Sequence, residues 1–160
     1  MKRVVIGLVG PIASGKGFLA EFLIKKGFAY WSLSDRVREE TDRRGLPRER
    51  GILQDIGNEL RLSFGPVVLV RQTLALISDA AELVIIDSIR NPMELDFLKA
   101  LGTVIVGVDA SVENRLGWYL ERAKKGARME RRRRLFIGPM PATWAKGRVP
   151  TASRGASVYV

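Results

Sequence analysis

The sequence contains neither cysteine nor histidine. Without cysteine it can form no disulfide, thiolate zinc site or cysteine nucleophile, and without histidine it lacks the imidazole base of most catalytic triads and most catalytic zinc sites. No apolar run reaches the ~20 residues that span a bilayer, and glycine and proline interrupt the N-terminal run before it could form a signal peptide. These absences predict a cytoplasmic protein without a membrane partner. Its chemistry must come from Lys, Arg, Asp, Ser and backbone amides.

Positive charge is concentrated near the C-terminus. The chain carries 27 basic and 17 acidic residues, a net charge of +10. Residues 126–160 hold eight of the basic residues and one acidic residue, which is +7, so residues 1–125 carry only +3. The tail has little apolar surface to offset chain entropy, so we expect it to be poorly ordered. Nucleic-acid binding through the tail is a third hypothesis, the least favoured because aromatics other than Phe136 and Trp144 are few.

Apolar runs alternate with helical patterns along residues 1–125. Continuous apolar runs are typical of strands buried on both faces, and apolar residues at helical spacing lie between them. This alternation predicts one α/β domain with a parallel sheet of about four strands flanked by helices, and a missing fifth strand. The expected strands are residues 4–8, 28–33, 83–86 and 104–108, and the clearest helical stripes lie in residues 18–23, 52–64 and 112–120.

A helical insertion separates the second and third expected strands. Residues 34–80 contain three helical segments, divided by Gly45-Leu46-Pro47 and by Gly65-Pro66. Glycine and proline are the strongest local signals for a break in a helix. The insertion is therefore expected to form a small helical unit on the sheet.

A phosphate-binding loop is the strongest motif in the sequence. Residues 10–17 read GPIASGKG, which fits G-x-x-x-x-G-K between a buried strand and an amphipathic helix. Amides of such a loop point inward, the helix presents its positive end, and the lysine reaches the outer phosphates of a nucleotide such as ATP. The alternative is a glycine turn with an exposed lysine. The expected contacts to ATP come from Gly10, Pro11, Ile12, Ala13, Ser14, Gly15, Lys16, Gly17 and Phe18, with Lys16 also catalytic.

The usual hydroxyl ligand for magnesium is absent after the loop lysine. Gly17 stands where serine or threonine is common, and Phe18 follows it. Mg²⁺ is therefore expected to be held mainly by water and nucleotide oxygens, with Asp87 nearby.

Asp87 and Arg90 follow the third expected strand. A carboxylate at the end of a buried strand lies at the carboxyl edge of the sheet, where α/β folds bind ligands. Asp87 could there orient water on Mg²⁺, as a metal and catalytic residue, and Arg90 could bind an acceptor phosphate with its planar guanidinium. In the alternative, Asp87 caps the next helix and Arg90 is solvated.

Asp35 and Arg38 open the insertion, one turn apart on a helix. Asp35 could orient the acceptor or accept its proton, which would make it a catalytic and substrate-binding residue, and Arg38 would bind the acceptor. In the alternative, Ser34 caps the helix, and the charged Arg and Glu side chains of the helix only keep it solvated.

Three further arginines, Arg115, Arg122 and Arg128, lie on or just after the helix that follows the last strand. They could bind a phosphate, but a solvated, charged helix face accounts for them just as well as a functional role does.

Taken together, these motifs resemble the nucleoside-monophosphate-kinase-like branch of P-loop kinases, near adenylate kinases, dephospho-CoA kinases and a group of kinase-like proteins related to both. The matching segments are GPIASGKG, LSDRVREE, LQDIGNELR and DSIRNPMELDFL. The resemblance covers residues 1 to about 125. Beyond about residue 126 the chain departs from the family pattern, which predicts a truncated or altered C-terminus.

The resemblance implies a function. It implies that Lys16 and the loop amides hold ATP, that Arg38 and Arg90 hold the acceptor phosphate, that Asp35 lies near the acceptor, and that a lid arginine, preferably Arg122, covers the transferring phosphate. The expected activity is transfer of the γ-phosphoryl group to a small nucleotide-like acceptor, with ATP and Mg²⁺. The alternative is a nucleotide-responsive binding protein without catalysis. The sequence indicates neither the acceptor nor the oligomeric state.

Overall fold

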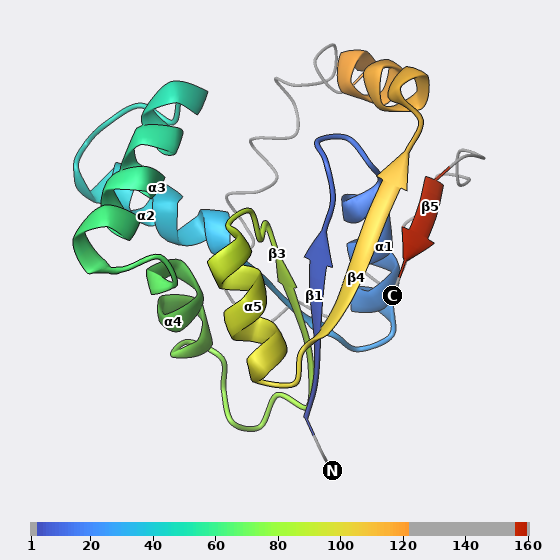
Figure 1. The fold of residues 1–160 in the computed structure, drawn as a ribbon, viewed down its shortest axis with the longest axis horizontal. Coiled ribbons are helices and arrows are strands. Elements are labelled where there is room, and N and C mark those ends of the chain that lie inside the picture. The colour runs from blue at the N-terminus through green and yellow to red at the C-terminus, as the bar shows by residue number, and fades with distance from the viewer. Residues whose placement is uncertain (1–2, 122–155, 160) are drawn as a thin grey trace.

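A five-stranded sheet forms the centre of the molecule in the computed structural model, which describes residues 3–121 and 156–159 (Figure 1). The strand order is β2-β3-β1-β4-β5. The first four strands run parallel, and β5 pairs antiparallel with β4. Their bounds are β1 Val4–Val9, β2 Ala29–Ser32, β3 Leu83–Asp87, β4 Val104–Ala110 and β5 Ala156–Tyr159.

Helices cover both faces of the sheet (Figure 1). The bounds are α1 Lys16–Lys25, α2 Leu33–Arg43, α3 Arg50–Phe64, α4 Val68–Leu74 and α5 Pro92–Ala100, and residues 112–121 are also helical. Helices α2, α3 and α4 lie between β2 and β3 in the sequence and pack on one another, as expected of the insertion. No helix among the described residues is long and apolar enough to cross a membrane.

Two apolar clusters hold these layers together, and β3 contributes to both. Val84 and Ile86 belong to the cluster that joins the sheet to the insertion and α5, whereas Ile85 belongs to the cluster under α1. All three side chains are fully buried. Alternate residues of a strand point to opposite faces, so an apolar run without polar residues is what a strand buried on both faces requires.

The prediction of a parallel four-stranded sheet flanked by helices is confirmed. The prediction that no strand follows the fourth one is wrong for residues 156–159, which form β5. Four residues carry too little local pattern to reveal a strand, and the pairing partners of β5 come from β4, from Gly107 opposite Tyr159 to Ala110 opposite Ala156. The other tail residues, up to residue 155, and Arg122 lie outside the described residues.

A buried glutamate joins the insertion to α5. Glu94 is fully buried, and its Oε1 accepts hydrogen bonds from the guanidinium of Arg61 in α3, with the Nε at 2.9 Å. Its Oε2 accepts from the backbone N–H groups of Arg90 and Asn91 at 3.3 and 3.2 Å. The Asn91 side chain in turn caps α5 by accepting from the Met93 N–H. One carboxylate thus closes a capping box and neutralises a cation from another helix.

We expect Glu94→Ala to destabilise the fold by about 3 kcal/mol, because it leaves the half-buried Arg61 without its anion and α5 without half of its cap. Thermal unfolding followed by circular dichroism measures this as a lowered midpoint. The control is Glu59→Ala, which removes an ion pair with Arg44 at the surface and should leave the midpoint nearly unchanged. Equal midpoints for the two variants would contradict the structural role of Glu94.

Candidate functional site

The loop between β1 and α1 has a backbone that few sequences can adopt. Gly10 and Gly15 have φ angles of 144° and 100°. A Cβ on Gly10 would lie 2.0 Å from the carbonyl oxygen of Val108 in β4, so only glycine fits there. Ala13 has a φ of 61°, which is uncommon for a residue with a side chain. The loop therefore holds a strained conformation, a feature that concentrates at ligand sites.

Lys16 and the beginning of α1 concentrate positive charge in this loop. The Lys16 Nζ donates hydrogen bonds to the carbonyl oxygens of Gly10 and Pro11, at 2.6 and 2.8 Å. The side chain therefore bends back across the loop rather than out into solvent. The first amides of a helix have no acceptor within the helix, and here no side chain caps them. An anion would meet both the ammonium group and the helix amides.

The donors gathered in the loop suit an anion such as a phosphate. Besides the ammonium and the amides, the Ser14 Oγ is buried and has no hydrogen-bond partner among the described residues. All of these groups can donate to an oxygen, and none carries negative charge. A neutral loop peptide with this many donors suits an anion far better than a cation.

Asp87 lies at the end of β3, the strand that pairs directly with β1. Its Oδ1 accepts a hydrogen bond from the Ser88 N–H at 2.6 Å, and its Oδ2 accepts one from the Tyr30 hydroxyl at 2.7 Å. Partial burial, followed by the charge of Asp87 and this hydrogen bond, raises the pKa of Tyr30 well above its ordinary value. Tyr30 therefore remains a proton donor to Asp87 at any physiological pH.

Three serine hydroxyls meet beside Asp87. Ser32, at the end of β2, lies opposite Asp87 in the sheet register. The hydroxyls of Ser32 and Ser34 donate to the Ser88 Oγ, at 2.9 and 3.1 Å. Ser88 has a φ of 66° and, with Ala13, is one of two non-glycine residues with positive φ in the described part of the chain. The hydroxyl cluster thus supports a strained residue next to the carboxylate.

Asp35 and Arg38 lie at the start of α2, close to the serines. The Arg38 Nη1 donates to the Asp35 Oδ1 at 2.5 Å and to the Ser34 Oγ at 3.1 Å. The side chain of Arg90, three residues after Asp87, is exposed, and no described residue forms an ion pair or hydrogen bond with it. Both guanidinium groups can therefore reach a ligand, Arg90 without breaking any existing contact.

The caps expected in the two alternatives are not found, although Arg90 is exposed as one of those alternatives expects. Asn91, not Asp87, caps α5 through its side chain. Helix α2 begins at Leu33 with Ser32 before it, so Ser34 lies inside the helix, and Ser32 makes no side-chain cap. The polar groups at these strand ends are thus engaged with one another instead of closing helices.

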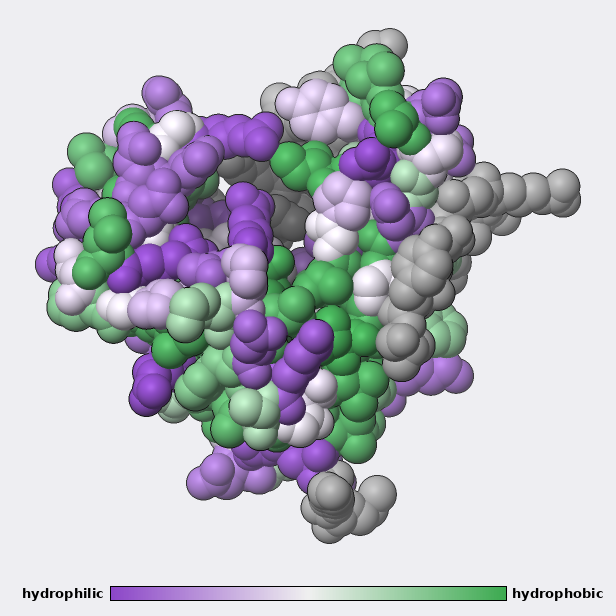
Figure 2. Space-filling view, in the orientation of Figure 1, coloured by the Kyte–Doolittle hydropathy of each residue, from purple (hydrophilic) through white to green (hydrophobic). Residues whose placement is uncertain are grey.

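The sheet order brings together most of the residues singled out from the sequence. The carboxyl ends of the parallel strands lie at one edge, between the insertion and the helix over 112–121, where Figure 2 shows a hollowed surface. The loop follows β1, Asp87 ends β3, and Asp35 with Arg38 follows β2. Arg115 pairs with Asp109 of β4 at 3.8 Å, and Arg122 is outside the described residues.

The residues present fit a magnesium ion only as a water-bound partner of a nucleotide. No group of three or more Asp, Glu, His or Cys side chains that could hold a metal occurs in the described part of the chain. Gly17 offers no hydroxyl and Phe18 is exposed. Magnesium commonly keeps several waters and binds one carboxylate together with substrate phosphates. Asp87 supplies such a carboxylate.

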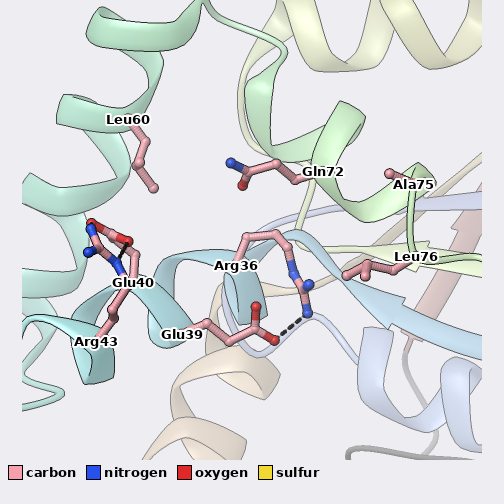
Figure 3. A pocket seen from close by; sticks show the side chains of 8 residues that line it. All are labelled: Arg36, Glu39, Glu40, Arg43, Leu60, Gln72, Ala75 and Leu76. Atoms are coloured by element: carbon pink, nitrogen blue, oxygen red, sulfur yellow. Dashed lines mark hydrogen bonds and ion pairs between the residues drawn. The ribbon is translucent and has the colours of Figure 1, made fainter.

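A separate pocket lies between the insertion helices (Figure 3). Arg36 and Arg43 lie on one side of α2 there, and Figure 3 shows each bonded to a glutamate, Glu39 and Glu40 respectively. Arg43 and Arg44 lower the pKa of Glu40 to about 2. Both arginines of this pocket pair with glutamates, so the pocket lacks an unpaired guanidinium such as the one that Arg90 offers at the strand ends. The lining residues are Arg36, Glu39, Glu40, Arg43, Leu60, Gln72, Ala75 and Leu76.

Sequence reasoning did not assign a role at the site to Tyr30, Ser32 or Ser88. Each lies within two residues of a strand end, and serines beside a strand-terminal aspartate are a usable signal. The missing information was the pairing of β2 with β3, because only that register sets Ser32 opposite Asp87. Local pattern does not reveal which strands are neighbours.

Among solved structures, the chain resembles the crystal structure of TT1252 from Thermus thermophilus. The two share 19% sequence identity with a TM-score of 0.52, over 84% of this chain and 81% of that one. At this identity the likeness concerns the fold alone. It supports the α/β architecture described above, a parallel sheet flanked by helices.

No family model matches the chain, but several curated relatives share one family name. The UPF0200 protein of Hyperthermus butylicus is 32% identical over 126 residues, which cover 78% of this chain and 68% of the relative. That of Sulfurisphaera tokodaii is 30% identical over 122 residues, covering 76% and 67%. The Pyrococcus abyssi protein is 28% identical over 145 residues, covering 88% and 72%.

The last of these matches reaches beyond the segments that carry the motifs. A match to 88% of this chain cannot fit inside the first 125 residues, so the similarity continues into the region where the motifs end. The motifs mark only the segments with recognisable chemistry. With two relatives at 30% identity or more across two thirds of their length, the chain belongs to the UPF0200 family.

Proposed function

We propose that the protein is an ATP-dependent kinase that transfers the γ-phosphoryl group to a nucleotide-like acceptor, of the nucleoside monophosphate or dephospho-CoA type. The observation that carries this proposal is the pairing of β1 with β3, which sets the lysine-bearing loop beside the strand that ends in Asp87. An anion-binding loop next to a carboxylate is the combination that a magnesium nucleotide requires. The resemblance to adenylate and dephospho-CoA kinases supports it.

The residues divide the work of phosphoryl transfer. The amides of residues 13–17 and Lys16 bind the phosphates of ATP, for which Lys16 leaves the carbonyl oxygens of Gly10 and Pro11. Asp87 orients a water of the magnesium ion, which when bound neutralises charge on the transferring phosphate. Arg38 and Arg90 hold the acceptor phosphate. These steps need only positioning and charge neutralisation, which account for most of the catalysis in phosphoryl transfer.

Asp35 acts as a general base only with some acceptors. If the accepting group is a hydroxyl, the Asp35 carboxylate can take its proton, since it lies beside the arginine that binds the acceptor. If the accepting group is a phosphate oxygen, no proton need be removed, and Asp35 only orients Arg38. The identity of the acceptor therefore decides whether Asp35 is a general base.

A second candidate function is nucleotide binding without catalysis. It is favoured by the glycine that follows Lys16, because the magnesium ion then lacks a direct hydroxyl ligand from the loop. Both functions include ATP binding. Only the kinase transfers phosphate to an acceptor.

Replacement of Lys16 tests the loop. We expect Lys16→Ala to weaken ATP binding about 10- to 100-fold, because a charge-assisted hydrogen bond contributes about 1.5–3 kcal/mol. Isothermal titration calorimetry with Mg²⁺ and ATP measures the change. Lys25→Ala, at the far end of α1, is the matched control and should bind as the unaltered protein does. No heat from the unaltered, folded protein would refute both candidate functions.

Replacement of Arg38 and Arg90 tests the acceptor side. We expect Arg38→Ala and Arg90→Ala each to raise the KM for the acceptor by about tenfold or more through loss of one charged contact, with ATP binding unchanged. A coupled assay over nucleoside monophosphates and dephospho-CoA first identifies the acceptor. Arg43→Ala, on another side of α2, is the control. ATP binding without transfer to any member of this panel would favour the non-catalytic candidate.

A further inference from the structure

Both oxygens of the Asp87 carboxylate have a donor that fixes their direction. The Tyr30 hydroxyl lies 2.7 Å from Oδ2 and the Ser88 N–H lies 2.6 Å from Oδ1. A carboxylate has about four acceptor positions, so two remain for a ligand. Rotation of the carboxylate would break both bonds at once. The remaining acceptor positions therefore point in one fixed direction.

The donor at Oδ1 is itself held in place. Ser88 adopts a left-handed backbone with a φ of 66°, which disfavours a residue with a side chain by about 1 kcal/mol or more. Its hydroxyl accepts bonds from Ser32 and Ser34, and Ser34 also accepts from Arg38. These bonds from β2 and α2 stabilise the conformation in which the Ser88 N–H points at Asp87.

The Tyr30 hydroxyl, which donates to Oδ2, is not needed for packing of the apolar core. Tyr30 lies on β2, the edge strand of the sheet, and its side chain is 37% exposed. A tyrosine hydroxyl in such a position could bond to water, so the fold alone gives no reason for it to bond to Asp87. The bond instead restricts the carboxylate that ends β3, the strand paired with β1 and so next to the phosphate loop.

The chemistry of the loop makes this restriction important. In loops with Ser or Thr after the lysine, the hydroxyl and a strand-end aspartate position the metal together. This chain has Gly17 there, so Asp87 is the carboxylate on which the position of the ion depends. A freely rotating carboxylate would bind the hydrated ion less well, because outer contacts that orient a ligand typically contribute 10- to 100-fold to metal affinity.

We propose that Tyr30 is a positioning residue for magnesium-dependent nucleotide binding, acting through the carboxylate of Asp87. This inference rests on the proposed function. It assigns no contact between Tyr30 and the nucleotide. It predicts that the hydroxyl of Tyr30 affects the magnesium requirement of ATP binding and leaves the binding of metal-free ATP unchanged.

The test is calorimetric titration of ATP at a series of Mg²⁺ concentrations. We expect Tyr30→Phe to raise the Mg²⁺ concentration for half-maximal enhancement of ATP binding about tenfold, with metal-free ATP affinity within twofold of the unaltered protein. Tyr119→Phe, the same change on the helix over 112–121, is the matched control. An unchanged magnesium requirement in Tyr30→Phe would overturn the proposal, as would a lower one.

A double-mutant cycle tests whether the effect passes through Asp87. In the Asp87→Asn background, Tyr30→Phe should have no further effect on the magnesium requirement, because the carboxylate is already gone. An equal effect in both backgrounds would show that Tyr30 acts elsewhere. Unfolding without ligand gives a second reading of the cycle, in which a coupling between the two substitutions is expected and additivity would count against the contact.

Ser88→Ala supplies an independent variant should Tyr30→Phe fail to fold. It removes the hydroxyl contacts to Ser32 and Ser34 and should raise the magnesium requirement in the same direction. A normal requirement in every folded variant overturns the inference while leaving ATP binding, and hence the proposed function, intact. Absence of ATP binding by the unaltered protein overturns both.

Discussion

The pairing of β3 between β1 and β2 is the constraint on which the candidate site depends. It sets the phosphate loop on one side of Asp87 and the hydroxyl groups of β2 on the other. The strand can occupy this central place because its residues are apolar on both faces, with Val84, Ile85 and Ile86 fully buried. A polar substitution in this run would therefore harm the fold and the site together. The candidate site and the core thus share one strand.

Among the described residues, the non-glycine positions with a left-handed backbone lie at the candidate site. The two non-glycine residues with positive φ in the described chain are Ala13, in the loop, and Ser88, beside Asp87. Each costs free energy that neighbouring contacts must offset. Ser88 receives two hydroxyl donors, whereas Ala13 lies buried within the loop. Such conformations persist where they aim a backbone amide, and the Ser88 amide is aimed at a carboxylate.

The sequence allowed the four parallel strands, the helical insertion and the phosphate loop to be predicted, because each has a local pattern. The partners of Asp87 could not be predicted in the same way. Tyr30 and Ser32 are adjacent to Asp87 only through strand pairing, and the bond of Ser34 to Ser88 joins residues 54 positions apart. The cap of α5 was not predicted either. The sequence analysis named only Asp87 as an alternative cap, whereas Asn91, a residue type equally favoured at that position, caps the helix. Strand β5 was missed because its partner is supplied by β4.

The two arginines proposed for the acceptor differ in what binding requires of them. The Arg90 side chain is exposed and forms no hydrogen bond or ion pair with another described residue, so binding an acceptor there would cost only the hydration of the acceptor and of the guanidinium. Arg38 already bonds to Asp35 and Ser34, and an acceptor phosphate must compete with a carboxylate at 2.5 Å. That competition links the acceptor side of the site, at Arg38, to the carboxylate of Asp87. A ligand that draws Arg38 from Ser34 removes one member of the hydrogen-bonded chain that runs through Ser88 to Asp87. Acceptor binding would thereby alter the support of the carboxylate expected to orient the metal, which is a physical route from one substrate to the other.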